Sequence, residues 1–167
     1  RPEDAKESCG FGLIAHQQGE ASHELVKTAC TALNRMTHRG AVAVDGKTGD
    51  GCGVLMQFPE SFFRQVAADE GMWLAERFAV GMIFLNPDPE IAARTRKILK
   101  KHIKHETLSI AGWRTVPTDP SVCGQIALSS MPTIEQVFVN IPSGWSRFDA
   151  ERRLFVARRM ALAENMQ

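Results

Sequence analysis

The sequence predicts a domain that mixes α-helices and β-strands, because apolar runs of strand length alternate with amphipathic segments of helical period. The clearest strand is residues 78–85 (FAVGMIFL), which we expect to be buried on both faces. Further strands are expected over residues 107–116 and 134–139. The length of 167 residues suits one ordinary domain. Periodicity leaves open whether the strands run parallel or antiparallel.

Local capping signals place the helices between these strands. Ser22 is the expected N-cap of a helix that stops at Gly40, and Pro59 begins a short helix. Asp88, followed by Pro and Glu, starts a longer helix, and Asp149 is expected to cap the last one. Two weaker strands are expected at residues 9–16 (CGFGLIAH) and 54–58, and a turn at 117–120.

The composition is that of a globular protein, with 44% hydrophobic and 23% charged residues. The net charge of +1 is scattered, which argues against a nucleic-acid partner. No apolar run approaches the roughly 20 residues that span a membrane, so we expect a cytoplasmic protein. The four cysteines lie far apart and the histidines are not grouped, so no metal site is expected. His102 and His105 are expected to be solvated or to complement a helix dipole.

Cys9 is the first candidate functional residue. It lies where a polar leader, residues 1–8, meets the glycine-spaced segment CGFG. Small neighbours would leave its sulfur accessible to a substrate. The alternative is a buried and inert strand cysteine, which is the commoner situation for a free thiol. The segment by itself does not decide between the two.

The second candidate is the glycine-rich loop at residues 40–53, GAVAVDGKTGDGCG. Its exposed N–H groups suggest a phosphate cradle, but such a cradle follows a strand and precedes a helix. Here the predicted order is helix, glycines, strand. The nucleotide-binding interpretation is therefore rejected, and the loop is either structural or the lining of a pocket.

Taken together, these segments resemble a known family. CGFGLIAH and NRMTHRGAVAVDGKTGDGCGVLMQ are similar to the amino-terminal class II glutamine amidotransferase domain of bacterial NADPH-dependent glutamate synthases. The resemblance continues through FAVGMIFLNPDPE, ETLSIAGWRTVPTD, IALSSMPTIEQVFVN and ERRLFVARR. It covers the chain from Cys9 to about Arg159. The GWRTVP segment favours glutamate synthase over relatives that make an amino sugar or asparagine.

The resemblance implies an α+β fold of the N-terminal-nucleophile hydrolases, with four α/β/β/α layers and antiparallel sheets. It also implies that Cys9 is the catalytic nucleophile and that its own α-amine, once freed, is the base. Residues 1–8 would then be a propeptide, and residues 9–167 the amino-terminal part of the amidotransferase domain. Glutamine would be hydrolysed to glutamate and ammonia, and the ammonia would be combined with 2-oxoglutarate to make a second glutamate.

The resemblance further assigns roles outside Cys9. Arg39 would bind substrate, and residues 39–47 would form a mobile loop at the glutamine entrance. The residues assigned to this gating loop are Gly40, Asp45, Gly46, Lys47, Asp50 and Gly51, with Asp50 and Gly51 holding its far end. No cofactor is expected in this chain. FMN and a 3Fe-4S cluster are expected in the rest of the subunit, and FAD and NADPH in a partner small subunit.

Two departures from the family pattern shape the alternative. First, no segment matches the family's oxyanion-hole Asn-Gly pair or the arginine that grips the glutamine carboxylate. Second, residues 1–8 still precede Cys9, so its amine is held in a peptide bond. The last predicted helix has no stop signal, so we expect the domain to be incomplete at its carboxyl end. The alternative function is therefore a non-catalytic structural fragment with no turnover in isolation.

Overall fold

The computed structural model describes residues 10–36, 42–49 and 51–165. The chain divides into two compact units, and each is described by itself. The first unit is built from the chain up to residue 58 together with residues 119–130. The second is built from residues 59–118 and from residue 131 onward.

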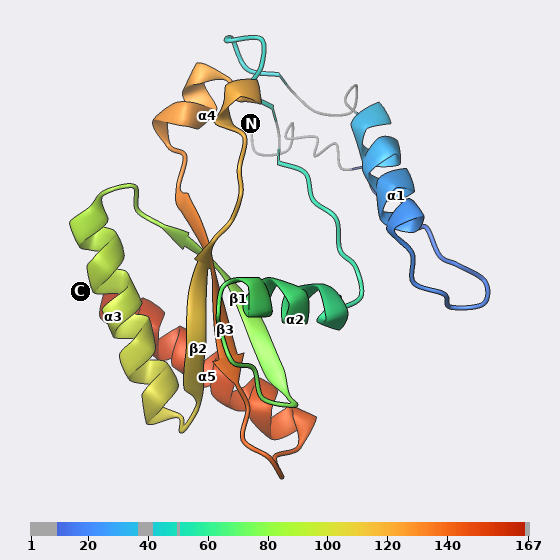
Figure 1. The fold of residues 1–167 in the computed structure, drawn as a ribbon. Helices are drawn as coiled ribbons and strands as arrows, with labels where there is room; N and C mark the ends of the chain where they lie inside the picture. The colour runs from blue at the N-terminus through green and yellow to red at the C-terminus, as the bar shows by residue number, and fades with distance from the viewer. Residues whose placement is uncertain (1–9, 37–41, 50, 166–167) are drawn as a thin grey trace, which may run out of the picture. The chain divides into compact units, whose positions relative to one another are not determined.

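The second unit is organised around a three-stranded antiparallel sheet (Figure 1). Its strands are β1 (Phe78–Leu85), β2 (Ser109–Thr115) and β3 (Thr133–Asn140), in the order β1-β3-β2. Val137 of β3 lies opposite Gly81 on one side and Trp113 on the other. The strand direction that the sequence left open is thus antiparallel, and the fold class is α+β as expected.

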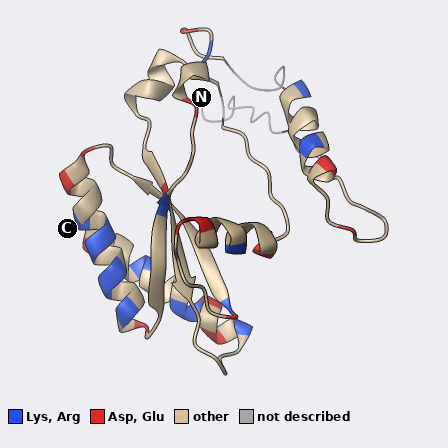
Figure 2. Cartoon of the chain, in the orientation of Figure 1, with Lys and Arg blue, Asp and Glu red and all other residues tan. Residues whose placement is uncertain are grey.

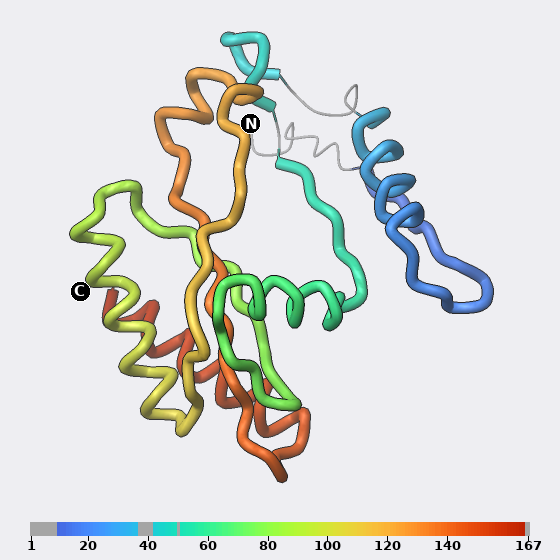
Figure 3. The backbone as a smooth tube through the Cα atoms, viewed as in Figure 1, coloured from blue at the N-terminus to red at the C-terminus, as the bar shows by residue number. Residues whose placement is uncertain are grey.

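Helices cover both faces of this sheet. Helices α3 (Pro89–His105) and α5 (Arg147–Asn165) lie on one face, where Val137 and Val139 pack with residues such as Ile103 and Ala157 (Figure 3). Helix α2 (Glu60–Asp69) lies on the other face, where Val66 and Ala67 pack on Phe138. The alternation of side chains along β3 divides the core into these two clusters.

Strand β1 has the predicted bounds but not the predicted burial. It is an edge strand of the sheet, and the side chains of Met82 and Phe84 are 48% and 65% exposed. The expectation that residues 78–85 are buried on both faces is therefore wrong. An apolar run indicates a strand, but the number of layers that cover it depends on the other elements.

Strand β3 buries three polar side chains, and each has a partner. The carboxylate of Glu135 accepts two hydrogen bonds from Arg96 of α3, at 2.6 and 2.8 Å. The amide oxygen of Gln136 accepts from Arg114 at 2.9 Å. Asn140 accepts from the backbone N–H of Ala75 at 2.8 Å and donates to the carbonyl of Trp73 at 3.2 Å. These bonds offset the cost of removing polar groups from water.

Helices α3 and α5 are joined by a charged cluster. Figure 2 shows the basic residues spread along α3. The carboxylate of Glu164 on α5 contacts Lys101 Nζ at 2.8 Å and His102 Nε2 at 2.7 Å. The hydrogen bond from Lys101, followed by the one from His102, lowers the pKa of Glu164. His102 is buried, so the solvated alternative is wrong for it, and its place in the last turn of α3 leaves the helix-dipole alternative.

The predicted caps of two helices are confirmed. Ser22 accepts a hydrogen bond from Leu25 N–H and starts α1 (His23–Arg35), and Asp88 accepts from Glu90 and Ile91 N–H at the start of α3. Helix α1 ends at Arg35, before the predicted stop at Gly40, which lies outside the described residues.

The last helix begins earlier than predicted. Helix α5 starts at Arg147, so Asp149 lies in its first turn and is not its cap. Ser146 Oγ accepts from the N–H of Asp149, as an N-cap side chain does, and its hydroxyl donates to the Asp149 carboxylate. The short acidic side chain therefore assists a serine cap.

Two of the weaker strand predictions are wrong. Residues 10–16 and 54–58 form no strand, and Phe11, Leu13 and Leu55 are exposed. A strand is stabilised by hydrogen bonds to a neighbour, and no described residue forms a ladder with either segment. Alternation of side chains alone does not supply that neighbour.

We expect Arg96→Met to lower the free energy of unfolding by about 2 kcal/mol, because the carboxylate of Glu135 would stay buried without its partner. Urea unfolding measures this loss. The double variant Arg96→Met/Glu135→Leu should regain most of the lost stability, because it also removes the buried carboxylate that has no partner in the single variant. The exposed ion pair of Arg147 with Glu151 provides the control, and Arg147→Met should leave the stability nearly unchanged. Equal losses in both single variants would contradict the assigned role of Glu135.

Candidate functional site

The described residues include half of the predicted site. Cys9, Arg39, Gly40 and Asp50 lie outside them. The structure places Asp45, Gly46, Lys47 and Gly51 in the first unit, the first three within a closed turn. The described geometry of the candidate site is therefore that of the loop.

Residues 42–49 form a narrow hairpin-like loop. An isolated antiparallel bridge pairs Val42 with Gly49, and Ala43 N–H donates to the carbonyl of Thr48 at 2.7 Å. Gly46 N–H donates to the carbonyl of Ala43 at 3.0 Å and closes the tip. Gly46 has φ +69°, in the left-handed region that a residue without Cβ adopts at least cost. The glycine-rich sequence thus forms a defined loop.

Asp45 organises the inside of this loop. Its Oδ1 accepts hydrogen bonds from the backbone N–H groups of Lys47 and Thr48, at 3.1 and 2.8 Å. Its Oδ2 accepts from the hydroxyl of Thr48 at 2.6 Å. The hydroxyl hydrogen bond, with help from the backbone donors, holds the pKa of Asp45 well below its usual range. Asp45 is therefore ionised throughout the physiological pH range.

Asp45 and Thr48 also contact a segment that is distant in sequence. The N–H of Ile126 donates to Asp45 Oδ2 at 3.1 Å, and the N–H of Ala127 donates to Thr48 Oγ1 at 3.2 Å. Both donors lie in the first turn of the five-residue helix α4 (Gln125–Ser129), which lies beside the loop in Figures 1 and 3. The loop therefore supplies the N-terminal capping groups of a helix about 80 residues away.

Gly124, the N-cap residue of α4, allows the two segments to approach. It has no side chain to cap the helix, and a Cβ at this position would lie 2.7 Å from Thr48 N and collide with Asp45 Oδ2 and Thr48 Oγ1. Glycine is required here by space. We call the set of Asp45, Thr48, Gly124, Ile126 and Ala127 the loop clasp.

The remaining predicted loop residues contribute less. Lys47 provides its backbone N–H and has an exposed side chain, and Gly51 has open space where a Cβ would be. The resemblance assigns the far end of the loop to Asp50 and Gly51 and gives no role to Thr48 or residues 124–127. A weak signal was present, since Gly124 precedes a short apolar helical run that has no polar cap of its own.

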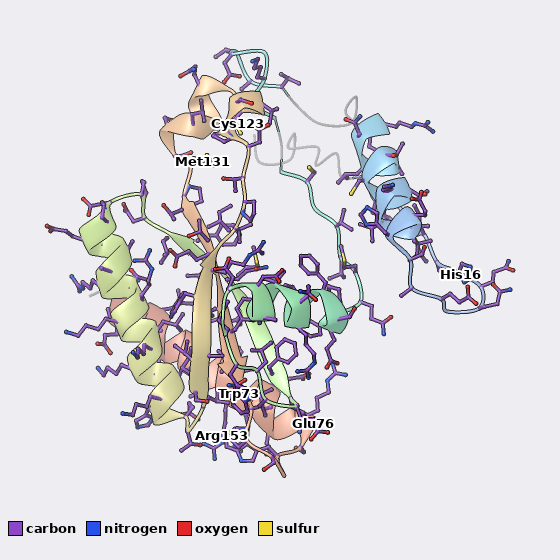
Figure 4. All side chains as sticks on the ribbon, in the orientation of Figure 1. His16, Trp73, Glu76, Cys123, Met131 and Arg153 are labelled. Atoms are coloured by element: carbon purple, nitrogen blue, oxygen red, sulfur yellow. The ribbon has the colours of Figure 1, made fainter. Side chains whose placement is uncertain are left out.

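The three described cysteines are free thiols. Cys30 and Cys52 are exposed, and Cys123 is half-buried in the 119–130 segment near α4 (Figure 4). Among the described residues, no group of three or more His, Cys, Asp and Glu side chains could hold a metal ion. No described helix is both long and apolar enough to cross a membrane.

We expect Asp45→Asn to weaken the loop clasp in a pH-dependent way. Because the folded pKa of Asp45 is depressed, its stabilising contribution is complete above the ordinary carboxyl pKa of 3.8 and is lost as the pH falls below that value. Hydrogen exchange of the Thr48 and Ile126 amides measures this local stability. The loss of protection in Asp45→Asn relative to the parent chain should be constant between about pH 5 and pH 8 and should shrink below about pH 4. A deficit that is unchanged at low pH would contradict an ionic role.

Comparison with known proteins identifies the family. The model of class II glutamine amidotransferases matches residues 9–167. The glutamate synthase [NADPH] large chain of Bacillus subtilis is 36% identical over 162 residues, which cover 96% of this chain and 11% of the relative. The chloroplastic ferredoxin-dependent glutamate synthase of Spinacia oleracea is 39% identical over 155 residues, which cover 92% of this chain and 10% of the relative.

The NADH-dependent glutamate synthase of Schizosaccharomyces pombe is 34% identical over 96% of this chain and 8% of the relative. The chain thus spans about a tenth of the length of these curated relatives. The match of the family model extends over nearly all of the sequence, including the loop clasp. The chain belongs to the class II glutamine amidotransferase family.

Proposed function

We propose that this chain is the glutaminase part of a glutamate synthase large chain, with Cys9 as the nucleophile. The observation that carries the proposal is where the family match begins, since the class II amidotransferase model starts at Cys9 and not within the polar residues before it. The relatives named above are all glutamate synthases, which favours this enzyme over an amidotransferase with another acceptor.

The proposed reaction needs only a thiol and an amine at the nucleophile. The α-amine of an amino-terminal Cys9 has an ordinary pKa near 8, so a useful fraction is neutral near pH 7 and accepts the thiol proton. The sulfur bonds to the carboxamide carbon of glutamine. The carbon–nitrogen bond then breaks, and the amine returns the proton to the leaving ammonia. Water attacks the thioester, which releases glutamate and restores the thiol.

Residues 1–8 then have a definite role in the proposal. While Ser8 is bonded to Cys9, the nitrogen is an amide and cannot accept the thiol proton. Removal of the leader creates base and nucleophile in one step. The polar sequence RPEDAKES has no periodic apolar face to bury, which supports its removal.

The rest of the proposal concerns the surroundings of Cys9. Arg39 binds glutamine beside the nucleophile, and residues 39–47 form the glutamine-entrance loop, with Gly40, Asp45, Gly46 and Lys47 in it. We propose an α/β/β/α arrangement for the complete domain, and the described antiparallel sheet with helices α3 and α5 on one face would be one α/β half of it, although α2 covers the other face here. In this proposal Asp50 and Gly51 hold the far end of the loop.

The complete enzyme would use the ammonia elsewhere in the same large chain. There FMN and a 3Fe-4S cluster would support its reductive addition to 2-oxoglutarate, with electrons from NADPH through FAD in a small subunit. We propose a cytoplasmic location for this assembly. The similarity to large chains about ten times longer supports the presence of such additional domains.

In a full-length glutamate synthase that carries this chain, Cys9→Ala should abolish glutamine-dependent glutamate formation and spare the ammonia-dependent reaction. Loss of a covalent nucleophile costs on the order of several powers of ten in rate. Steady-state rates with each nitrogen donor measure the two activities. Cys30→Ala is the matched control and should be silent, because this thiol lies exposed on α1. Persistent glutamine-dependent turnover without Cys9 would refute the assignment.

The active enzyme should begin at Cys9. Intact-mass measurement and amino-terminal sequencing of fully active protein should show that residues 1–8 are absent. Replacement of Ser8 by Pro, a change intended to block cleavage, should leave the leader attached and the glutamine-dependent activity low. Full activity with Ser8 attached stoichiometrically would show that the α-amine is not the base.

A further inference from the structure

We propose that Asp45, Thr48 and Gly124 are positioning residues of the glutaminase reaction. Through the loop clasp they fix the glutamine-entrance loop to residues 124–127, so that these four residues, which lie between β2 and β3 in the sequence, contribute to glutamine binding. This inference rests on the function proposed above and assigns a role to residues that the resemblance left out or placed in the loop without a partner.

The clasp restrains the loop because it is formed at two points. Asp45 Oδ2 and Thr48 Oγ1 each accept one backbone N–H of α4, at 3.1 and 3.2 Å. The two acceptors are themselves joined by the 2.6 Å hydrogen bond from the Thr48 hydroxyl. One contact would leave the loop free to rotate about it, whereas two linked contacts also fix its orientation. One charged and one hydroxyl side chain thus set the position of the whole 42–49 turn.

Helix α4 depends on the loop as much as the loop depends on α4. A helix of five residues is far shorter than the roughly 12–15 residues at which isolated helices become marginally stable. Its N-cap residue, Gly124, supplies no side-chain acceptor. Two of its first-turn N–H groups are satisfied by the loop. Loss of the clasp therefore leaves both the loop and α4 less ordered.

The clasp affects binding through the entropy of the loop. A loop that is already held at one end loses less conformational freedom when a substrate orders the remainder. Asp45 lies within the proposed entrance loop, residues 39–47, and Thr48 follows it directly. Removal of the clasp should therefore weaken glutamine binding and leave chemistry at a distant ammonia-using site unchanged.

The test compares kinetics with two nitrogen donors in full-length glutamate synthase. Thr48→Val keeps the shape of the side chain and removes the hydroxyl. Gly124→Ala places a methyl group where Asp45 and Thr48 lie. Both should raise the KM for glutamine by about tenfold, which corresponds to the loss of a charge-assisted hydrogen bond. The KM for ammonia and the ammonia-dependent kcat should stay within about twofold of the parent values.

Two further variants separate positioning from general stability. Thr48→Ser keeps the hydroxyl and should restore the parent KM for glutamine. Asp119→Ala removes the cap of the neighbouring 3-10 turn (Pro120–Val122), where the carboxylate of Asp119 accepts hydrogen bonds from Ser121 N–H and Oγ. Because Asp119 has no hydrogen bond to the described loop residues 42–49, this control should leave both activities unchanged. If Asp119→Ala raised the KM for glutamine as much as Thr48→Val, any loosening of residues 119–130 would be enough to weaken glutamine binding. That result would overturn the proposed role of the loop clasp.

A second measurement follows the nucleophile directly. A diazoketone analogue of glutamine should alkylate Cys9. Loss of the ammonia-dependent reaction in Thr48→Val would also overturn the proposed role of the loop clasp, because the clasp would then support folding as a whole. Glutamine use without Cys9 would instead remove the proposed function itself.

Discussion

Burial of strand β3 is the constraint on which the second unit depends. Six consecutive residues of this strand, from Glu135 to Asn140, are buried, and three of them are polar. Each buried polar group needs a hydrogen-bond partner, because an unpaired one costs more than the bond contributes when it is made. The partners come from α3, from β2 and from the segment between α2 and β1. No described buried side-chain nitrogen or oxygen lacks a partner. The central strand can therefore be buried only when its surrounding elements are all in place.

The same strand also closes the connection that follows β2. Strands β2 and β3 are antiparallel neighbours, and the register pairs Thr115 with Glu135 near the point where β2 ends and β3 begins. Val116 N–H continues the ladder to the carbonyl of Ile134 at 2.9 Å. The chain between them thus leaves and re-enters the sheet at adjoining strand ends.

The loop clasp combines charge with short-range geometry. Asp45 is ionised because four donors surround its two oxygens, and the hydroxyl of Thr48 is the strongest of them in its effect on the pKa. A carboxylate near the first turn of a helix also interacts favourably with the partial positive charge of that end. The glycine at position 124 is as necessary as the carboxylate, because any side chain there would occupy the space of the acceptors. The family to which the chain belongs gives this loop its proposed place beside the glutamine site.

The sequence by itself determined the features that depend on neighbouring residues. Ser22 and Asp88 cap the helices that they precede, and the apolar run of β1 has the predicted bounds, because capping and periodicity act within a few residues. The motif around Cys9 and the glycine loop identified the family without any geometry. Local signals were insufficient at residues 10–16 and 54–58, since a strand exists only with a partner that the described chain does not provide there.

Only the tertiary structure decided which distant residues meet. The burial of His102 against Glu164, the pairing of Arg96 with Glu135, and the contact of Asp45 and Thr48 with α4 each join residues 39 to 81 positions apart. None of these partners is encoded in the spacing around the residue concerned. Such contacts form because desolvated charges and unsatisfied helix N–H groups must find acceptors or donors wherever the fold brings them together.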